Sequence, residues 1–271
     1  MQKKTSIILL IICALMLAAS CDDKPKKTNP KGDATAQTTK PAPVNVPAFS
    51  ADSAYAYIES QLAFGPRVPG TSEHRACGDW MVDMLKKSGA TVTEQTGEVK
   101  AWNLDGDQIT LPLRNIIASF QPKKGRRIIF SAHWDTRPYA DEGPERKDQP
   151  IPGANDGGSG VAVLLEMARH FGKENPNVGI DLILWDVEDH GNPKIQDSYC
   201  RGSQYWGRIP HKAGYAAMYG VNLDMVGAKG ATFIPDDFSM QYGKPVVDMV
   251  WNQGIALGYS KQFRFGNSGG I

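Results

Sequence analysis

The sequence predicts an α/β fold in which a mostly parallel, mixed and twisted sheet carries helices on both faces. Three short apolar runs, at 127–132, 180–185 and 219–223, are typical of buried central strands, which are covered on both sides. Segments with apolar residues at helical spacing lie before, between and after these runs. Strands that alternate with helices favour a parallel sheet, and ligands of such sheets bind beyond the carboxyl ends of the strands.

Hydrophobic spacing and chain-breaking residues give the element boundaries. Apolar residues at helical spacing predict helices, and Ser50 or Asp52 is the expected cap of the first one. Alternating or continuous apolar residues predict strands. The expected helices cover 52–64, 72–87, a segment that begins just before 161, and 246–257. The expected strands cover 91–99, 113–120, 127–132, 180–185 and 219–223.

Composition narrows the class of function. The chain has 271 residues, with 30 Lys and Arg against 29 Asp and Glu, and a formal net charge of +1. A nucleic-acid-binding protein would carry a clustered basic excess, so nucleic acid is not expected as a partner. The 4 cysteines are too few for a disulfide scaffold, and Cys77 and Cys200 fit free thiols as well as a disulfide.

The first residues have the features of a bacterial export signal. Lys3 and Lys4 precede an unbroken apolar run, and small residues then lead to Cys21. The sequence Ala-Ala-Ser-Cys at 18–21 resembles the lipobox of bacterial lipoproteins, in which the cysteine is acylated. We therefore expect a lipoprotein-type signal peptide over 1–20 and an exported lipoprotein. Lipidated Cys21 would anchor it to a membrane, facing the periplasm or the cell surface.

A solvated tether is expected between the signal and the folded part. Residues 22–47 are rich in Lys, Thr, Pro and Ala, contain no aromatic side chain, and cannot bury enough apolar surface to offset the entropy of ordering. The expected organisation is a signal at 1–20, a disordered tether at 21–49 and one domain at 50–271.

Acidic side chains and one histidine gather where the predicted strands end. Carboxylates crowded above one sheet would repel each other unless a cation neutralised them. Histidine and carboxylate ligands with one open position suit zinc. The adjacent Glu188 and Asp189 point in different directions, so one can hold metal while the other transfers protons. Asp135 could orient His133 or a neighbour. The set is His133, Asp135, Asp156, Glu188, Asp189 and Asp224.

Four motifs contain these residues. They are His-Trp-Asp-Thr-Arg at 133–137, Asn-Asp-Gly-Gly-Ser-Gly at 155–160, Val-Glu-Asp at 187–189 and Leu-Asp-Met-Val-Gly at 223–227. Together they resemble the zinc aminopeptidase-like superfamily, and most closely its bacterial glutaminyl-peptide cyclotransferases, or glutaminyl cyclases. Flanking segments that support this branch lie at 64–71, 74–80, 202–206 and 227–233.

The resemblance implies a zinc-dependent enzyme that converts the N-terminal glutamine of peptides or proteins to pyroglutamate and releases ammonia. It implies Asp156 and Asp189 as ligands of a single zinc ion. It also implies Glu188 as the acid that transfers protons and Asp224 as the aspartate that binds the substrate's amino group. The family's third zinc ligand is a later histidine, so we expect the domain to be C-terminally incomplete at residue 271.

Two alternatives remain open at this stage. A zinc aminopeptidase would remove N-terminal residues with two zinc ions that share Asp156, and His133 and Asp224 would serve the second ion. A truncated, non-catalytic lipoprotein would bind no zinc. His190, which adjoins Asp189, could replace the missing histidine, although an exposed loop position is expected for it.

Overall fold

The structure is a computed structural model that describes residues 46–266. Within that range the helices are α1 (Ala51–Ala63), α2 (Ser72–Lys87), α3 (Gly158–Lys173), α4 (Arg201–Arg208) and α5 (Asp237–Ala256). The strands are β1 (Thr91–Trp102), β2 (Gln108–Phe120), β3 (Arg127–His133), β4 (Gly179–Trp185) and β5 (Tyr219–Asn222). The predicted signal peptide, the lipidation site Cys21 and most of the predicted tether lie outside the described residues and stay predictions.

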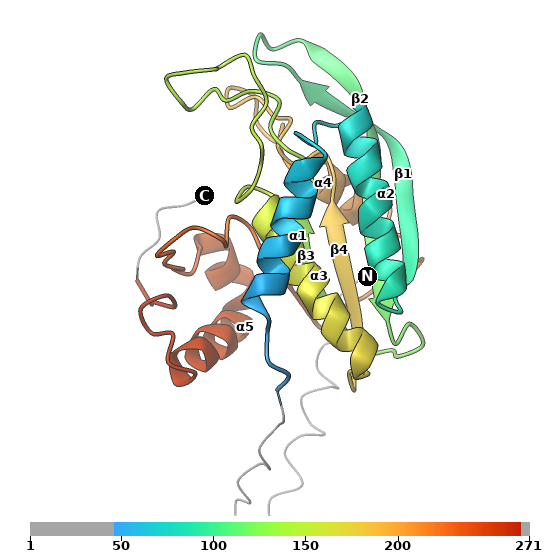
Figure 1. The fold of residues 1–271 in the computed structure, drawn as a ribbon, viewed down its shortest axis with the longest axis vertical. Helices are drawn as coiled ribbons and strands as arrows, with labels where there is room; N and C mark the ends of the chain where they lie inside the picture. The colour runs from blue at the N-terminus through green and yellow to red at the C-terminus, as the bar shows by residue number, and fades with distance from the viewer. Residues whose placement is uncertain (1–45, 267–271) are drawn as a thin grey trace, which may run out of the picture. The chain divides into compact units, whose positions relative to one another are not determined.

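A five-stranded sheet in the order β1-β2-β4-β3-β5 lies at the centre of the described part (Figure 1). β3 runs parallel to β4 and to β5, which confirms the parallel arrangement of the three buried apolar runs. β1 and β2 pair antiparallel, and β2 also pairs antiparallel with β4. The predicted mixed sheet is confirmed. β1 and β2 run antiparallel because a short turn, and not a crossover helix, joins them.

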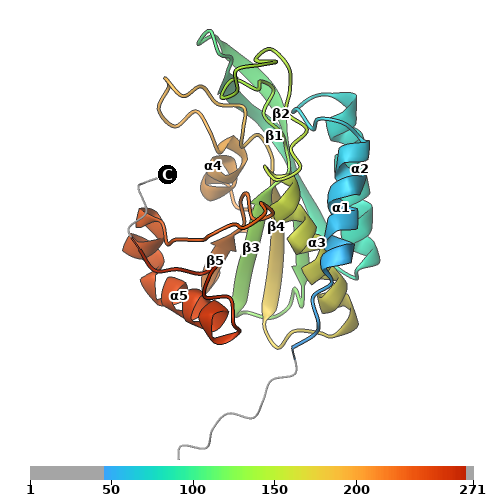
Figure 2. The same ribbon diagram turned by 60° about the vertical axis from the view of Figure 1, so that its left-hand side comes forward.

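Helices cover both faces of this sheet, as predicted. Figure 2 shows α1, α2 and α3 on one face and α4 and α5 on the other. α3 packs against β3 and buries the apolar face that the sequence indicated, with Val161, Leu164, Leu165 and Ala168 in the main core. No helix among residues 46–266 combines the length and the apolar character that crossing a bilayer requires.

The boundaries differ from the prediction mainly in the last two helices. The apolar pattern gives no sign of α4, which is short and polar. α5 begins at Asp237, well before the expected start at 246, and Asp236 caps it by accepting a hydrogen bond of 2.8 Å from the Ser239 N–H. Pro245, which cannot donate an N–H, lies directly before the expected start but inside the observed helix. It follows a kink at Gly243, where that missing donor disturbs little.

Parallel pairing brings three strand ends to one edge of the sheet. His133 pairs with Trp185, and Ser131 pairs with Asn222, so the segments after β3, β4 and β5 all leave at this edge. The start of α3 reaches the same place. A Cβ at Gly160 would collide with the carbonyl oxygen of Leu223, so glycine is required for α3 to start this close to the end of β5.

The buried carboxylate of Glu166 ties the start of α1 to α3. It accepts a hydrogen bond of 3.0 Å from the Ser50 N–H and two, of 2.5 and 2.7 Å, from the Arg169 guanidinium. The hydrogen-bonding Arg169 side chain is the main reason that the pKa of Glu166 falls to about 2. Ser50 also caps α1, as predicted, so its contact with Glu166 connects α1 to α3.

Replacement of Glu166 by glutamine is therefore expected to lower the free energy of unfolding by about 2 kcal/mol at pH 7. The folded-state pKa lies below the ordinary value of 4.5, so the wild-type advantage is complete above pH 4.5 and is lost as the pH falls toward 2. Urea unfolding of both proteins at pH 7 and pH 3 measures this. Exposed Glu59→Gln on α1 is the control, and an undiminished difference at pH 3 would contradict the assignment.

Candidate metal centre

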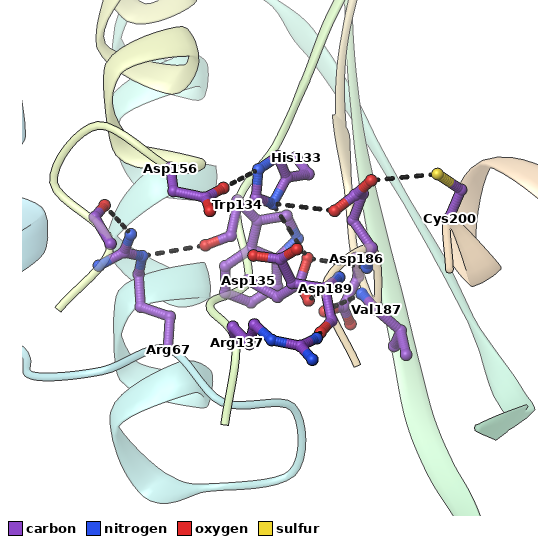
Figure 3. Close-up of polar contacts among 12 residues, drawn as sticks. Arg67, His133, Trp134, Asp135, Arg137, Asp156, Asp186, Val187, Asp189 and Cys200 are labelled. Atoms are coloured by element: carbon purple, nitrogen blue, oxygen red, sulfur yellow. Dashed lines mark hydrogen bonds and ion pairs between the residues drawn. The ribbon is translucent and has the colours of Figure 1, made fainter. Parts of the chain in front are cut away.

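Three side chains from separate segments meet where β3, β4 and β5 end. His133 ends β3, Asp156 lies in the loop before α3, and Asp189 follows β4. One ligand atom from each lies within 4.8 Å of the other two. His133 Nε2 is 2.9 Å from Asp156 Oδ1, and Figure 3 shows these two groups facing each other.

Unpartnered buried atoms indicate that this cluster fits a cation. Within the described residues, Asp189 Oδ2 is buried and makes no hydrogen bond, and buried His133 Nε2 makes none of acceptable geometry although it faces Asp156 Oδ1. A buried polar atom left in this way costs about 1–3 kcal/mol, so a bound metal ion explains both atoms at once. One imidazole nitrogen and two carboxylates are the donor types of catalytic zinc sites.

The pKa values of the cluster show how closely its charged groups are crowded. Burial raises the pKa of Asp189 to about 9, and the charges of Glu188, Asp135 and Asp156 add to the effect. Burial opposes the protonated form of His133, but the carboxylates around it outweigh burial and raise the pKa of this imidazole. Carboxylates this close together are stable as anions only beside a cation.

Glu188 lies beside the three ligand candidates. Its Oε2 is 4.0 Å from His133 Nδ1, and its Oε1 accepts a hydrogen bond of 3.0 Å from the Cys200 thiol. Burial raises the pKa of Glu188, and the Asp135 carboxylate works in the same direction against the opposing effect of His133. A buried carboxyl group with a raised pKa beside a metal centre is suited to proton transfer.

Asp224 borders the open side of the cluster. Its Oδ1 is 3.5 Å from His133 Nε2, and its side chain is 45% exposed. The neighbouring His133 side chain is the main cause that lowers the pKa of Asp224. This carboxylate therefore stays charged and accessible, and it can accept hydrogen bonds from an ammonium group.

Two fully buried carboxylates fix the turn that carries Glu188 and Asp189. Asp186 accepts a hydrogen bond of 2.8 Å from the Val187 N–H, and Asp135 accepts bonds of 3.0 and 3.1 Å from the next two N–H groups. Val187 has φ +52°, a strained conformation for a β-branched residue. Asp135, predicted to orient a neighbour, therefore holds the backbone of both acids.

A cleft of about 360 Å³ opens beside the ligand cluster. Asp156 and Asp189 line it, together with other residues of the β3–α3 loop. Arg137 of this loop forms two bonds of 2.5 Å with Asp141 and lies 5.5 Å from the ring centroid of Tyr199. The cleft is at the small end of the range for ligand sites, so it suits a substrate group of one or two residues.

His190 is not the exposed loop residue expected from the sequence. Its side chain is 5% exposed because Tyr139 of the β3–α3 loop covers it edge-on. Within the described part of the chain it joins no three-ligand group. Cys77 and Cys200 are both free thiols, which settles the question left open by their number.

Comparisons with known proteins agree with this geometry. Residues 115–265 match the model of peptidase family M28. The structure is similar to a Zn-dependent exopeptidase from Parabacteroides distasonis, with 47% identity and a TM-score of 0.80 over 84% of this chain and 79% of that chain. It is also similar to Porphyromonas gingivalis glutaminyl cyclase, with 50% identity and a TM-score of 0.79 over 82% of this chain and 77% of that chain.

Curated relatives match over a smaller part of their length. Aminopeptidase YwaD of Bacillus subtilis (strain 168) is 29% identical over 168 residues, which are 60% of this chain and 31% of YwaD. The chain likewise spans 31% of the other curated relative that it matches. The family match covers more than half of the chain and includes every residue of the candidate centre. The chain therefore belongs to peptidase family M28.

Proposed function

We propose that this protein is a glutaminyl-peptide cyclotransferase that uses zinc to convert the N-terminal glutamine of peptides or proteins to pyroglutamate. The observation that carries the proposal is the 50% identity to Porphyromonas gingivalis glutaminyl cyclase over 82% of this chain. The candidate metal centre supports it, because a buried acid and an exposed carboxylate flank the ligand cluster. Zinc bound there would polarise the carbonyl of the substrate's side-chain carboxamide.

Asp156 and Asp189 are the proposed ligands of a single zinc ion. Each presents a carboxylate oxygen to the shared space, and His133 lies within the same 4.8 Å group. Asp135 keeps Asp189 in place through its N–H group. The two ligands are therefore placed by the end of one strand, β4, and the start of one helix, α3.

Glu188 and Asp224 would act on the substrate's amino group. Asp224, on the open side, binds and orients this nitrogen. Glu188 takes a proton from it as the nitrogen forms a bond to the side-chain carbonyl carbon. Glu188 then gives that proton to the leaving amide nitrogen, which departs as ammonia when the carboxamide C–N bond breaks. Both reacting groups belong to one residue, so correct positioning supplies much of the rate enhancement.

A zinc exopeptidase is the second candidate, and the position of His133 favours it. His133 Nε2 is 2.9 Å from Asp156 and 3.5 Å from Asp224, so these three residues could hold a second ion with Asp156 shared. Glu188 would then take a proton from water for peptide-bond hydrolysis. The same side chains thus serve either reaction.

Product analysis separates the two reactions. We expect the zinc-loaded protein to convert a peptide that begins with glutamine to its pyroglutamyl form. Each peptide molecule should release one ammonia and stay otherwise intact. Mass spectrometry detects this product, and the same peptide acetylated at its N-terminus is the control without a reactive amine. Release of free glutamine would establish the exopeptidase instead. A protein that binds no zinc and forms neither product would agree with a non-catalytic lipoprotein.

A further inference from the structure

Arg67, in the loop between α1 and α2, is a fully buried charged side chain. Among the described residues it forms an ion pair with no carboxylate, whereas buried Arg127 at the start of β3 pairs with Asp181 at 2.6 Å. Burial of an unpaired charge is costly and needs compensation. The reason for a charge at this position must therefore lie in the bonds that Arg67 does make.

The guanidinium of Arg67 donates to three backbone carbonyls. Nε donates to Trp134 at 2.9 Å, Nη1 to Pro152 at 3.1 Å and Nη2 to Gly153 at 2.7 Å. Figure 3 shows Arg67 on the helix side of the ligand cluster, with its bonds directed at these segments. The Arg67 carbonyl in turn accepts a bond of 3.1 Å from the Thr136 N–H.

These carbonyls belong to the two segments that present His133 and Asp156. Trp134 directly follows His133 at the end of β3, and Gly153 ends the loop that leads to Asp156. Gly153 has φ +66°, and a Cβ there would collide with Arg67 and Thr136. The loop therefore passes as close to the arginine as a glycine allows.

We propose that Arg67 is a positioning residue of the metal centre, whose planar guanidinium sets the separation of His133 and Asp156. Its donors form a rigid fork, and the acceptors lie on two segments that no regular secondary structure joins. A lysine would keep the charge but replace the fork with a flexible stem and a point-like ammonium. The inference rests on the proposed metal centre and holds equally for a cyclase and an exopeptidase.

The test compares Arg67→Lys with Arg127→Lys in the full chain. Both variants disturb a buried arginine that borders β3, but Arg127 lies at the strand end away from the ligands. Zinc affinity is measured by competition with a chelator, and the visible spectrum of bound Co²⁺ reports ligand geometry. We expect Arg67→Lys to weaken zinc binding by about 10–100-fold and to change the Co²⁺ spectrum. Arg127→Lys should unfold at lower urea concentration and keep wild-type metal binding.

A second variant changes the loop that Arg67 contacts and leaves Arg67 itself unchanged. Gly153→Ala leaves Arg67 in place, but the added Cβ would meet Thr136, Arg67 and the carbonyl oxygen of Asp156, so the loop must shift and zinc affinity should fall. If Arg67→Lys keeps wild-type zinc affinity and an unchanged Co²⁺ spectrum, Arg67 only supports the fold. If Arg67→Lys does not fold, the same result in Gly153→Ala leads to the same conclusion. Failure of the wild-type protein to bind zinc would refute the metal centre itself.

Discussion

Replacement of Glu188 by glutamine is expected to remove turnover and leave the metal centre loaded. Glutamine keeps the size of the side chain and an oxygen that can accept the hydrogen bond from Cys200, but it cannot take up a proton. Loss of a general acid–base group typically costs 10²–10⁴-fold in rate. We expect kcat to fall by about that factor with little change in KM, because Asp224 would still bind the substrate.

Ammonia release from a glutaminyl peptide measures kcat and KM, and metal analysis measures zinc content. Glu145→Gln is the matched control, since this exposed carboxylate lies in the β3–α3 loop but does not line the cleft. Its kcat should remain close to that of the wild type. Substantial turnover in Glu188→Gln would remove this residue from the mechanism, and simultaneous loss of zinc would make it a ligand. Glu188 handles a proton in either candidate reaction, so the result does not depend on the choice between them.

The convergence of His133, Asp156 and Asp189 follows from the sequence pattern, whereas their role as metal ligands stays a prediction. Parallel strands end at one edge of a sheet, so residues at the ends of apolar runs must meet there. His133 ends β3, Asp189 follows β4 and Asp156 precedes α3, and the three side chains do converge. Local sequence carries this information because each residue lies within a few positions of a strand or helix end.

The supporting residues were hidden because their partners are distant in sequence. His74 Nε2 lies 2.8 Å from Asp186, which is 112 residues later in the chain, and Asp186 accepts a hydrogen bond from the Val187 N–H. Arg67 binds backbone carbonyls, which every residue type possesses, so no residue pattern identifies its partners. The one available signal was a charged residue inside the Gly-Pro-Arg-Val-Pro-Gly segment at 65–70, where a loop on the surface would have been an equally good interpretation.

Replacement of Asp156 by asparagine is expected to weaken zinc binding without lowering the stability of the metal-free protein. A neutral amide oxygen is a much weaker zinc ligand than a carboxylate, so we expect zinc affinity to fall by more than about 100-fold, beyond the loss typical of supporting residues. Zinc at 100 times the wild-type dissociation constant stabilises the wild-type fold by about 2.7 kcal/mol. A variant with 100-fold weaker binding would gain only about 0.4 kcal/mol under the same conditions.

The metal-free proteins should not show this difference. The charge of Asp156 contributes to the raised pKa of Asp189, which means that these two carboxylates repel each other. Loss of this repulsion offsets loss of the 2.9 Å contact with His133, so metal-free Asp156→Asn should be about as stable as the metal-free wild type, and less stable once zinc is added. Urea unfolding with and without zinc measures both differences, with exposed Asp148→Asn in the preceding loop as the control. A variant that loses stability without zinc, or keeps the full stabilisation by zinc, would show that Asp156 supports the loop and does not bind metal.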